Sequence, residues 1–279
     1  MGEFWETECP LPIVRQSPVD AVVDRATRST IASTIIRNLN FLCVTVCCPG
    51  TLGSSASAKI EGYALNEIEG WTVYVEEALL EQEPEDTAKA LVLLSEQARK
   101  VIDVIPAKIV RELQGVPLWL SLPHEGRSPR AEFHPDKGWL INNGMIPDKE
   151  KSIEFTNTNI LDKEVIRMPM LLLHELSHAY HNLVLGFEQP DILRLYEKAK
   201  ENGSYDLVER KNRELQMAYA MINHKEYFAE CTEAFFGEND FYPFNKKELK
   251  QHDPAMHALL EQLWSEQADD RSALGKTFV

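Results

Sequence analysis

The sequence has few cysteines, and most of them lie near its N-terminus. Four of the five precede residue 59, namely Cys9, Cys43, Cys47 and Cys48, and Cys231 is the only one that follows. The chain after residue 58 therefore has no internal disulfide. Cys231 falls within an apolar helical pattern, so it is interpreted as a core residue and not as a nucleophile.

The chain also lacks a basic excess and a long hydrophobic run. Its formal net charge is −15, which argues against nucleic acid as a partner because phosphate binding needs a basic surface. If the acidic residues surround a cleft, they would favour the binding of basic peptide substrates. If they lie elsewhere on the surface, they contribute only to solubility. The apolar run Phe41–Cys48 is too short to cross a bilayer, so no stable membrane span is expected.

Residues 1–58 differ in composition from the rest. The run Phe41–Cys48 follows three arginines and precedes Ala56-Ser57-Ala58. These are the parts of a secretory signal, although they begin unusually far from the first methionine. The sequence leaves open a signal with an extended start, a disordered leader or an added helix, and therefore a secreted or a cytoplasmic location. Residues 59–279 are long enough to form one domain with one core.

The chain contains the segment His174-Glu175-Leu176-Ser177-His178, which follows an apolar run at residues 168–173. On a helix, residues four apart share a face, so His174 and His178 can bind one metal ion. Glu175 is rotated from that pair by about 100° and can reach a water at the metal. This is the pattern of a zinc hydrolase. The alternative is a core helix with two partly buried histidines.

A catalytic zinc needs a third protein ligand. His181 is a poor one, because a straight helix places it about 10 Å along the axis from His174. Metzincins solve this with a glycine turn, but here the glycine position is His181 and the last ligand position is Val184. The metzincin class is therefore excluded.

A second helix is predicted from residue 219 to Gly237, which supplies the stop signal. Glu226, Glu230 and Glu233 share one face of it, where three acids are costly unless a cation compensates them or water solvates the face. The functional interpretation makes Glu226 the third ligand. Glu230, one turn later, would accept a hydrogen bond from a ligating histidine. Spacing alone does not choose between these two acids.

The two motifs together resemble the lethal-factor-like zinc metallopeptidases of bacteria and fungi, named after the catalytic domain of anthrax lethal factor. The resemblance covers roughly the last half of the chain. It implies that Glu226 of Glu226-Tyr-Phe-Ala-Glu230 is the third Zn²⁺ ligand. It also implies that Tyr219, seven residues earlier, stabilises the developing oxyanion. No sequence for the translocation domain of lethal factor is present, so delivery by a toxin partner is not implied.

Elements before the motif suggest an α+β fold. Strands are predicted at residues 71–75, 116–122 and 152–157, and a helix at 91–105. Their order resembles a zincin-like metallopeptidase, with a small N-terminal sheet, an active-site helix and a helical C-terminal half. In that resemblance the free edge of strand 152–157 holds an extended peptide. Ile153, Glu154 and Phe155 would then bind substrate; the alternative is an ordinary sheet strand.

The sequence thus predicts a Zn²⁺-dependent endopeptidase that acts on peptides or proteins. Zinc held by His174, His178 and Glu226 would activate a water molecule. Glu175 would serve as general base and then general acid, and Tyr219 would donate to the oxyanion. Two alternatives remain: a zinc hydrolase with a non-peptide substrate, and a catalytically idle zinc-binding module. The oligomeric state is left open.

Overall fold

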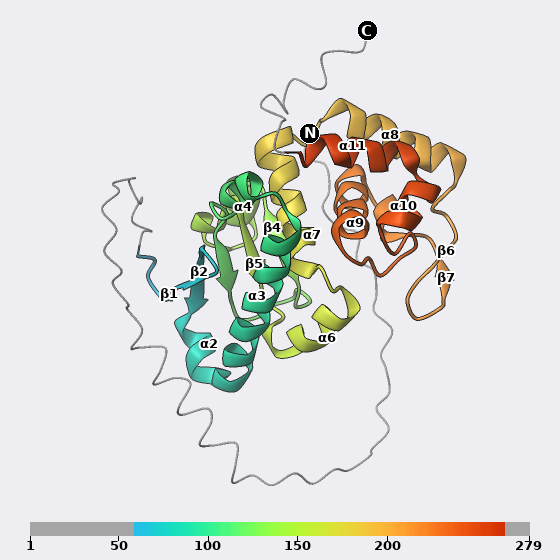
Figure 1. The fold of residues 1–279 in the computed structure, drawn as a ribbon. Coiled ribbons are helices and arrows are strands. Elements are labelled where there is room, and N and C mark those ends of the chain that lie inside the picture. The colour runs from blue at the N-terminus through green and yellow to red at the C-terminus, as the bar shows by residue number, and fades with distance from the viewer. Residues whose placement is uncertain (1–58, 266–279) are drawn as a thin grey trace, which may run out of the picture. The chain divides into compact units, whose positions relative to one another are not determined.

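A five-stranded mixed sheet forms the first part of the computed structural model, which describes residues 59–265 (Figure 1). The strands are β1 (Tyr63–Ile68), β2 (Trp71–Glu76), β3 (Leu118–Leu120), β4 (Ala131–His134) and β5 (Ser152–Phe155). Their order across the sheet is β1-β2-β3-β5-β4, with parallel pairing in the middle and an antiparallel strand at each edge. The predicted leader, residues 1–58, lies outside the described residues.

The two faces of the sheet differ because side chains alternate along each strand. One face carries Leu118, Leu120, Ile153 and Phe155, which are buried in the main hydrophobic core. The other carries a row that crosses four strands, formed by Tyr74, Trp119, Glu154 and Glu132. Tyr74 stacks on Trp119 with ring centroids 4.3 Å apart. Only the first face is therefore available to pack against apolar helices.

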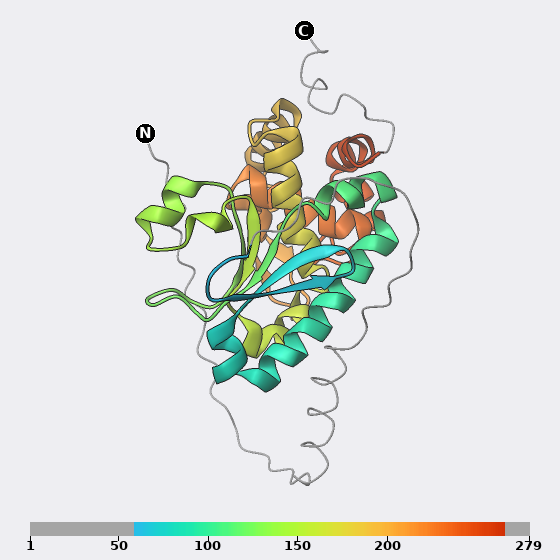
Figure 2. The same ribbon diagram turned by 90° about the vertical axis from the view of Figure 1, so that its left-hand side faces the viewer.

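Most helices of the first half cover the apolar face and the ends of the sheet, whereas the segment 137–149 lies against the other face, where Trp139 stacks on His134 and Lys149 binds Glu154. Figure 2 shows the longest of them running along the sheet. They are α2 (Glu77–Gln82), α3 (Pro84–Val104), α4 (Ala107–Leu113), α5 (Lys137–Asn142) and α6 (Leu161–Arg167), with single 3₁₀ turns at Pro147–Lys149 and Thr158–Ile160. Helix α3 buries Ala90, Leu94, Ala98 and Val101, the spacing of one helical stripe.

The second half of the described chain is helical. Its elements are α7 (Leu171–Tyr180), a π-helical turn (His181–Leu185), α8 (Pro190–Asn202), the short strands β6 (Val208–Glu209) and β7 (Leu215–Gln216), a 3₁₀ turn (Tyr219–Met221), α9 (His224–Phe236), α10 (Lys246–His252) and α11 (Pro254–Leu263). Helix α7 contacts α3, β4 and β5, and it also contacts α9 (Figure 1). Because it packs on both sides, nine of its ten residues are buried.

The predicted α+β arrangement, with a small N-terminal sheet and a helical C-terminal half, is present. The predicted strands correspond to β2, β3 and β5, and the predicted helix at 91–105 is the greater part of α3. The edge strands β1 and β4 were not predicted. Within residues 59–265, no helix is both long and apolar enough to cross a membrane.

One prediction about the sheet is wrong. Strand β5 has no free edge, because it pairs with β3 on one side and with β4 on the other. Ile153 and Phe155 lie in the core, and Glu154 is completely buried. None of the three therefore offers a backbone edge to a peptide. The edge strand on this side of the sheet is β4.

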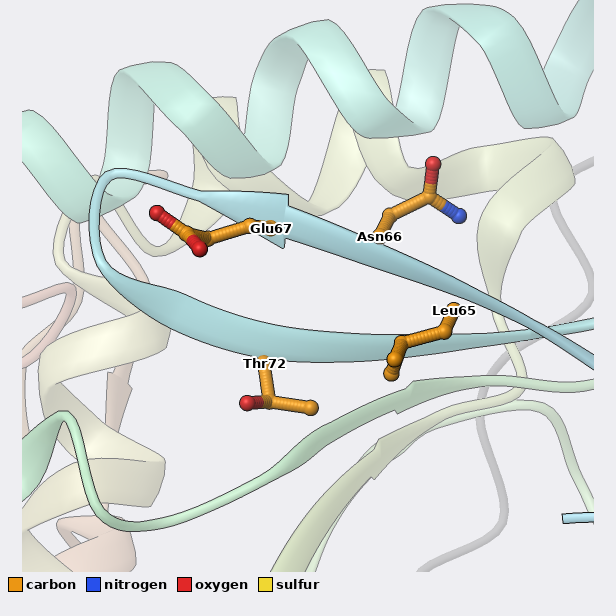
Figure 3. Close-up of a pocket in the computed structure, with 4 residues that line it drawn as sticks. All are labelled: Leu65, Asn66, Glu67 and Thr72. Atoms are coloured by element: carbon orange, nitrogen blue, oxygen red, sulfur yellow. The ribbon is translucent and has the colours of Figure 1, made fainter. Parts of the chain in front are cut away.

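The opposite edge of the sheet ends in the hairpin of β1 and β2. Leu65, Asn66, Glu67 and Thr72 line a small pocket on it (Figure 3). Glu69 and Gly70 form the turn with positive φ angles of 50° and 88°. The turn is fixed by Gln114, whose side-chain amide donates to the Glu69 carbonyl at 2.9 Å.

Replacing Gly70 with alanine should lower the free energy of unfolding by about 2 kcal/mol or more. The new Cβ would sit in the left-handed region and 2.4 Å from the Gln114 amide nitrogen. Gly62→Ala is the matched control, since Gly62 also has a positive φ but no neighbour within 4 Å. Urea unfolding of both variants measures the difference. Equal losses would show that the contact with Gln114 is unimportant.

Candidate metal centre

Three side chains from two helices meet at one point. His174 and His178 come from α7, and Glu226 comes from the first turn of α9. The Nε2 atoms of the two histidines are 3.1 Å apart. The Glu226 Oε2 atom lies 3.2 Å from His174 Nε2 and 3.3 Å from His178 Nε2. The three atoms therefore form a nearly equilateral triangle.

The size of this triangle fits a metal ion. A tetrahedral zinc with ligands at about 2.05 Å holds those ligands about 3.3 Å from one another. Two imidazoles and one carboxylate are also a donor set found in catalytic zinc sites, where the fourth position is open. The donor set and the spacing thus both suit Zn²⁺, although other divalent ions accept the same ligands.

The electrostatics of the three residues also favour a cation. Burial acts to raise the pKa of the Glu226 carboxyl, but the neighbouring His178 and His174 hold it well below its usual value, so it stays ionised. Burial acts to lower the pKa of His174, yet its hydrogen bonds with Glu226 and Glu233 raise it well above the usual value. The carboxylates therefore attract positive charge to this point, which a divalent cation would supply.

Local sequence signals determine the position of Glu226, the third residue of the triad. Asn223 caps α9, and its side-chain oxygen accepts from the backbone N–H groups of Lys225 and Glu226. The cap sets the first turn of the helix, which carries Glu226, against α7. At the other end of α9, Gly237 lies against Met170, the residue before α7. A Cβ on Gly237 would come within 2.6 Å of the Met170 side chain.

The other nitrogen of His174 is held by a different acid from the one predicted. His174 Nδ1 lies 2.7 Å from Glu233 Oε1, which is a hydrogen bond, whereas the nearest oxygen of Glu230 is 4.0 Å away. The two ring nitrogens of His174 point in opposite directions. The seven residues from Glu226 to Glu233 rotate by about 700° around the helix axis, which is close to two full turns. Glu233 therefore lies on the same stripe as Glu226 but about 10 Å further along, on the far side of the ring.

A buried ionic group lies behind this contact. Glu230, Glu233 and Asp240 are each at most 2% exposed. Burial raises the pKa of Glu230 and of Glu233, and the negative charge of Asp240 adds to both effects. Arg210 compensates Asp240 with Nη2 2.8 Å from Oδ2, and Arg167 approaches the same oxygen at 3.5 Å.

Glu175 is buried next to the triad, and its carboxylate makes no hydrogen bond with any residue in the range 59–265. Burial raises the pKa of its carboxyl, and the negative charges of Glu226 and of Glu132 on β4 contribute. A carboxylate that is sequestered from water but has no protein partner is available to exchange a proton with a bound molecule.

Tyr219 lies in the 3₁₀ turn before α9 and not at the head of that helix. Its side chain is 41% exposed, although its neighbours Ala218 and Ala220 are buried. Desolvation and the nearby charges of Glu226 and Glu175 raise the pKa of the phenol, so it remains a proton donor at neutral pH. The structure therefore places Tyr219 within electrostatic reach of the triad, with part of its surface open.

His181 does not join the triad. It is completely buried in the π-helical turn and packs on Phe187 and Phe228. Burial lowers the pKa of its imidazole, so it stays neutral. This agrees with the expectation that a straight helix carries His181 away from the ion.

Glu154 belongs to a separate polar cluster on the other face of the sheet. Its carboxylate binds the Lys149 amine, and His124 Nε2 and His134 Nε2 lie 3.0 and 2.9 Å from it. Glu132, His134 and Glu154 form a second group with metal-binding side chains. The ammonium of Lys149 already neutralises Glu154, however, and would repel a second cation. The first triad is therefore the stronger candidate.

Comparisons with known proteins add little to this geometry. No protein-family model matches the chain, and no curated protein does. A solved structure that is similar is the Pro-Pro endopeptidase PPEP-2 from Paenibacillus alvei, with 16% sequence identity and a TM-score of 0.37. The alignment covers 63% of this chain and 90% of that chain. A TM-score this low carries no argument about this protein.

Substitution of the three acids of α9 should weaken Zn²⁺ binding to different extents, according to how closely each acid contacts the metal centre. Glu226→Ala should lose Zn²⁺ at micromolar metal because one of three ligands is gone. Glu233→Ala should weaken Zn²⁺ affinity by about 10- to 100-fold, since it leaves His174 Nδ1 without its acceptor. Glu230→Ala should have a smaller effect. Titration against a chromophoric chelator measures the Zn²⁺ affinity of all three variants, and circular dichroism shows whether each variant is folded. A larger loss for Glu230→Ala than for Glu233→Ala would contradict the assignment.

Proposed function

We propose that this protein is a zinc-dependent endopeptidase of the lethal-factor-like, zincin type. The observation that supports this most strongly is the triangle of His174 Nε2, His178 Nε2 and Glu226 Oε2, with edges of 3.1–3.3 Å, beside the unpartnered carboxylate of Glu175. A structural zinc would need a fourth protein ligand and no adjacent base. An open triad next to a base favours hydrolysis.

His174, His178 and Glu226 would hold the ion. Zinc bound there would supply a Lewis acid that polarises the scissile carbonyl and lowers the pKa of water. When an ion replaces the proton on Nε2, Glu233 would accept from Nδ1 and so fix the tautomer of His174 whose lone pair is on Nε2.

Glu175 moves the protons of the reaction. It follows His174 directly in α7, so it lies beside the triad without being part of it. Its carboxylate takes a proton from the attacking water as general base and returns it to the leaving amine as general acid. Burial favours this role because it brings the pKa of the carboxyl nearer to neutral pH.

Tyr219 supplies the hydrogen-bond donor that would stabilise the developing oxyanion. The phenol keeps its proton because its pKa is raised, and it is free to turn towards the substrate because no hydrogen bond within residues 59–265 holds its hydroxyl. Its hydrogen bond would strengthen as negative charge develops on the carbonyl oxygen, which is the condition for catalysis by a donor.

The edge strand β4 is the place where an extended substrate can pair. The backbone carbonyls of Arg130 and His134 accept hydrogen bonds from the N–H groups of Thr156 and Lys151. Arg130 and His134 therefore direct their backbone groups towards β5. By alternation, Ala131 and Phe133 direct theirs outward. Helix α7 contacts β4, so a peptide added to this edge would run beside the triad.

Glu175→Gln should remain folded and bind Zn²⁺ normally, yet lose at least about 100-fold in kcat, since the amide cannot accept the proton of water. The measurement is hydrolysis of a mixed peptide library, followed by mass spectrometry, with metal content determined on the same samples. Full activity in this variant would refute the mechanism.

Tyr219→Phe should lower kcat by about 10- to 1,000-fold with little change in KM, because the lost hydrogen bond forms mainly in the transition state. Tyr242→Phe is a suitable control, since the Tyr242 ring packs on Phe244 and His252. Unchanged kinetics for Tyr219→Phe would make this tyrosine a packing residue, and the oxyanion donor would have to be another group.

A further inference from the structure

The two-stranded ribbon of β6 and β7 has one buried and one exposed face. Val208 pairs with Gln216 and Glu209 pairs with Leu215 in antiparallel register. Opposite residues of such a pair share a face, and successive residues alternate. Leu207, Leu215 and Met217 therefore share one face, and Val208 lies on the other, where it is only 5% exposed.

The exposed face of the ribbon carries three apolar side chains together with Glu209, which is exposed and pairs with Leu215. Leu207 is 68% exposed, Leu215 63% and Met217 55%. Twelve large hydrophobic side chains are exposed among residues 59–265, and five of them fall between residues 207 and 222. This is a local concentration and not the scattered exposure that is normal for a protein surface. We refer to Leu207, Leu215 and Met217 as the apolar strip.

The ribbon is held firmly, so the strip has a fixed place. The Glu209 carbonyl accepts from the Tyr242 N–H at 2.8 Å, and the Lys211 N–H donates to the Asp240 carbonyl at 2.9 Å. The Arg210 guanidinium donates to the Asp240 side chain. Asp240 is also the acid that lies close to Glu230 and Glu233 behind the metal centre. The ribbon is therefore attached to the buried group that supports His174.

The strip leads into the candidate metal centre. Leu215, Met217 and Tyr219 are exposed, whereas Ala218 between the last two is buried; Tyr219 itself lies beyond the ribbon, in the 3₁₀ turn that packs against α9. The Tyr219 phenol interacts with the charges of Glu226, His174 and Glu175. Met217 and Leu215 are the exposed side chains two and four residues before Tyr219 in the chain.

We propose that the apolar strip binds side chains of the substrate next to the scissile bond, and that it selects peptides with leucine, methionine or phenylalanine there. This inference rests on the proposed peptidase function and specifies the substrate class. Three side chains are too small an area for a stable dimer, which buries roughly 800 Å² on each partner. They match the few residues that a peptidase contacts on one side of the bond.

The test uses the full-length protein with Zn²⁺ and a library of internally quenched peptides, in which each position in turn is fixed as leucine, serine or lysine. The wild-type protein should cleave leucine peptides about 10-fold faster than serine peptides, in kcat/KM, at one or two positions on one side of the bond. Leu215→Ser and Met217→Ser should each reduce that ratio to about 3-fold or less. Met217→Glu should create a preference for lysine at the same position.

The matched control is Leu65→Ser. Leu65 is 52% exposed on β1, at the opposite edge of the sheet from β4 (Figure 3). This variant should keep the leucine-to-serine ratio of the wild-type protein. Zn²⁺ content of every variant is measured alongside, which separates a change in selectivity from damage to the metal centre.

Three results would overturn the proposal. If the wild-type protein cleaves peptides but Leu215→Ser and Met217→Ser keep its leucine-to-serine ratio, the strip does not contact substrate, and the peptidase function stands. If sedimentation shows a dimer that Met217→Glu dissociates without altering selectivity, the strip is a contact between two copies. If the zinc-loaded wild-type protein cleaves no peptide, the proposed function fails together with this inference.

Discussion

The structure depends on the contact between α7 and α9, at which one imidazole is held from both sides. His174 has Glu226 at Nε2 and Glu233 at Nδ1. Two acids two helical turns apart thus clamp one ring, and this sets both the rotation and the axial position of α9 relative to α7. Buried carboxylates are costly without positive charge. The same contact that joins the two helices therefore also creates the demand for a cation.

Much of the site could be predicted because its signals are local. His174, Glu175 and His178 lie within five residues, and the helical period puts the two histidines together without knowledge of the rest of the fold. Glu226 could be placed on the correct face of the second helix for the same reason. The choice of Glu233 over Glu230 could not be made from the sequence, because it depends on how far α9 is displaced along α7, and no local pattern encodes that distance.

The sheet shows the opposite case. Strands β2 and β3 are largely apolar and β5 alternates apolar with polar residues; all three were predicted, but their order is a long-range property. Strand β4 has four residues, as β5 does, and contains a glutamate and a histidine, so its own sequence is a weak strand signal. It nevertheless takes the edge position that the sequence interpretation had given to residues 152–157. Whether a strand lies at the edge of a sheet depends on its neighbours in space. The neighbours of β5 are β3 and β4, which come from two different segments of the chain.

Gly237 has a consequence beyond the end of its own helix. It sits where the last turn of α9 meets Met170 at the start of α7, and there is no room between them for even a methyl group. This close approach is a second contact between the two helices, at a point about 16 Å along α9 from Glu226. A residue with a Cβ at this position would displace the Met170 side chain and so alter the packing where the chain enters α7. Glycine at position 237 thus lets the end of α9 close onto the start of α7, and the two helices that carry the candidate ligands touch at a second point far from those ligands.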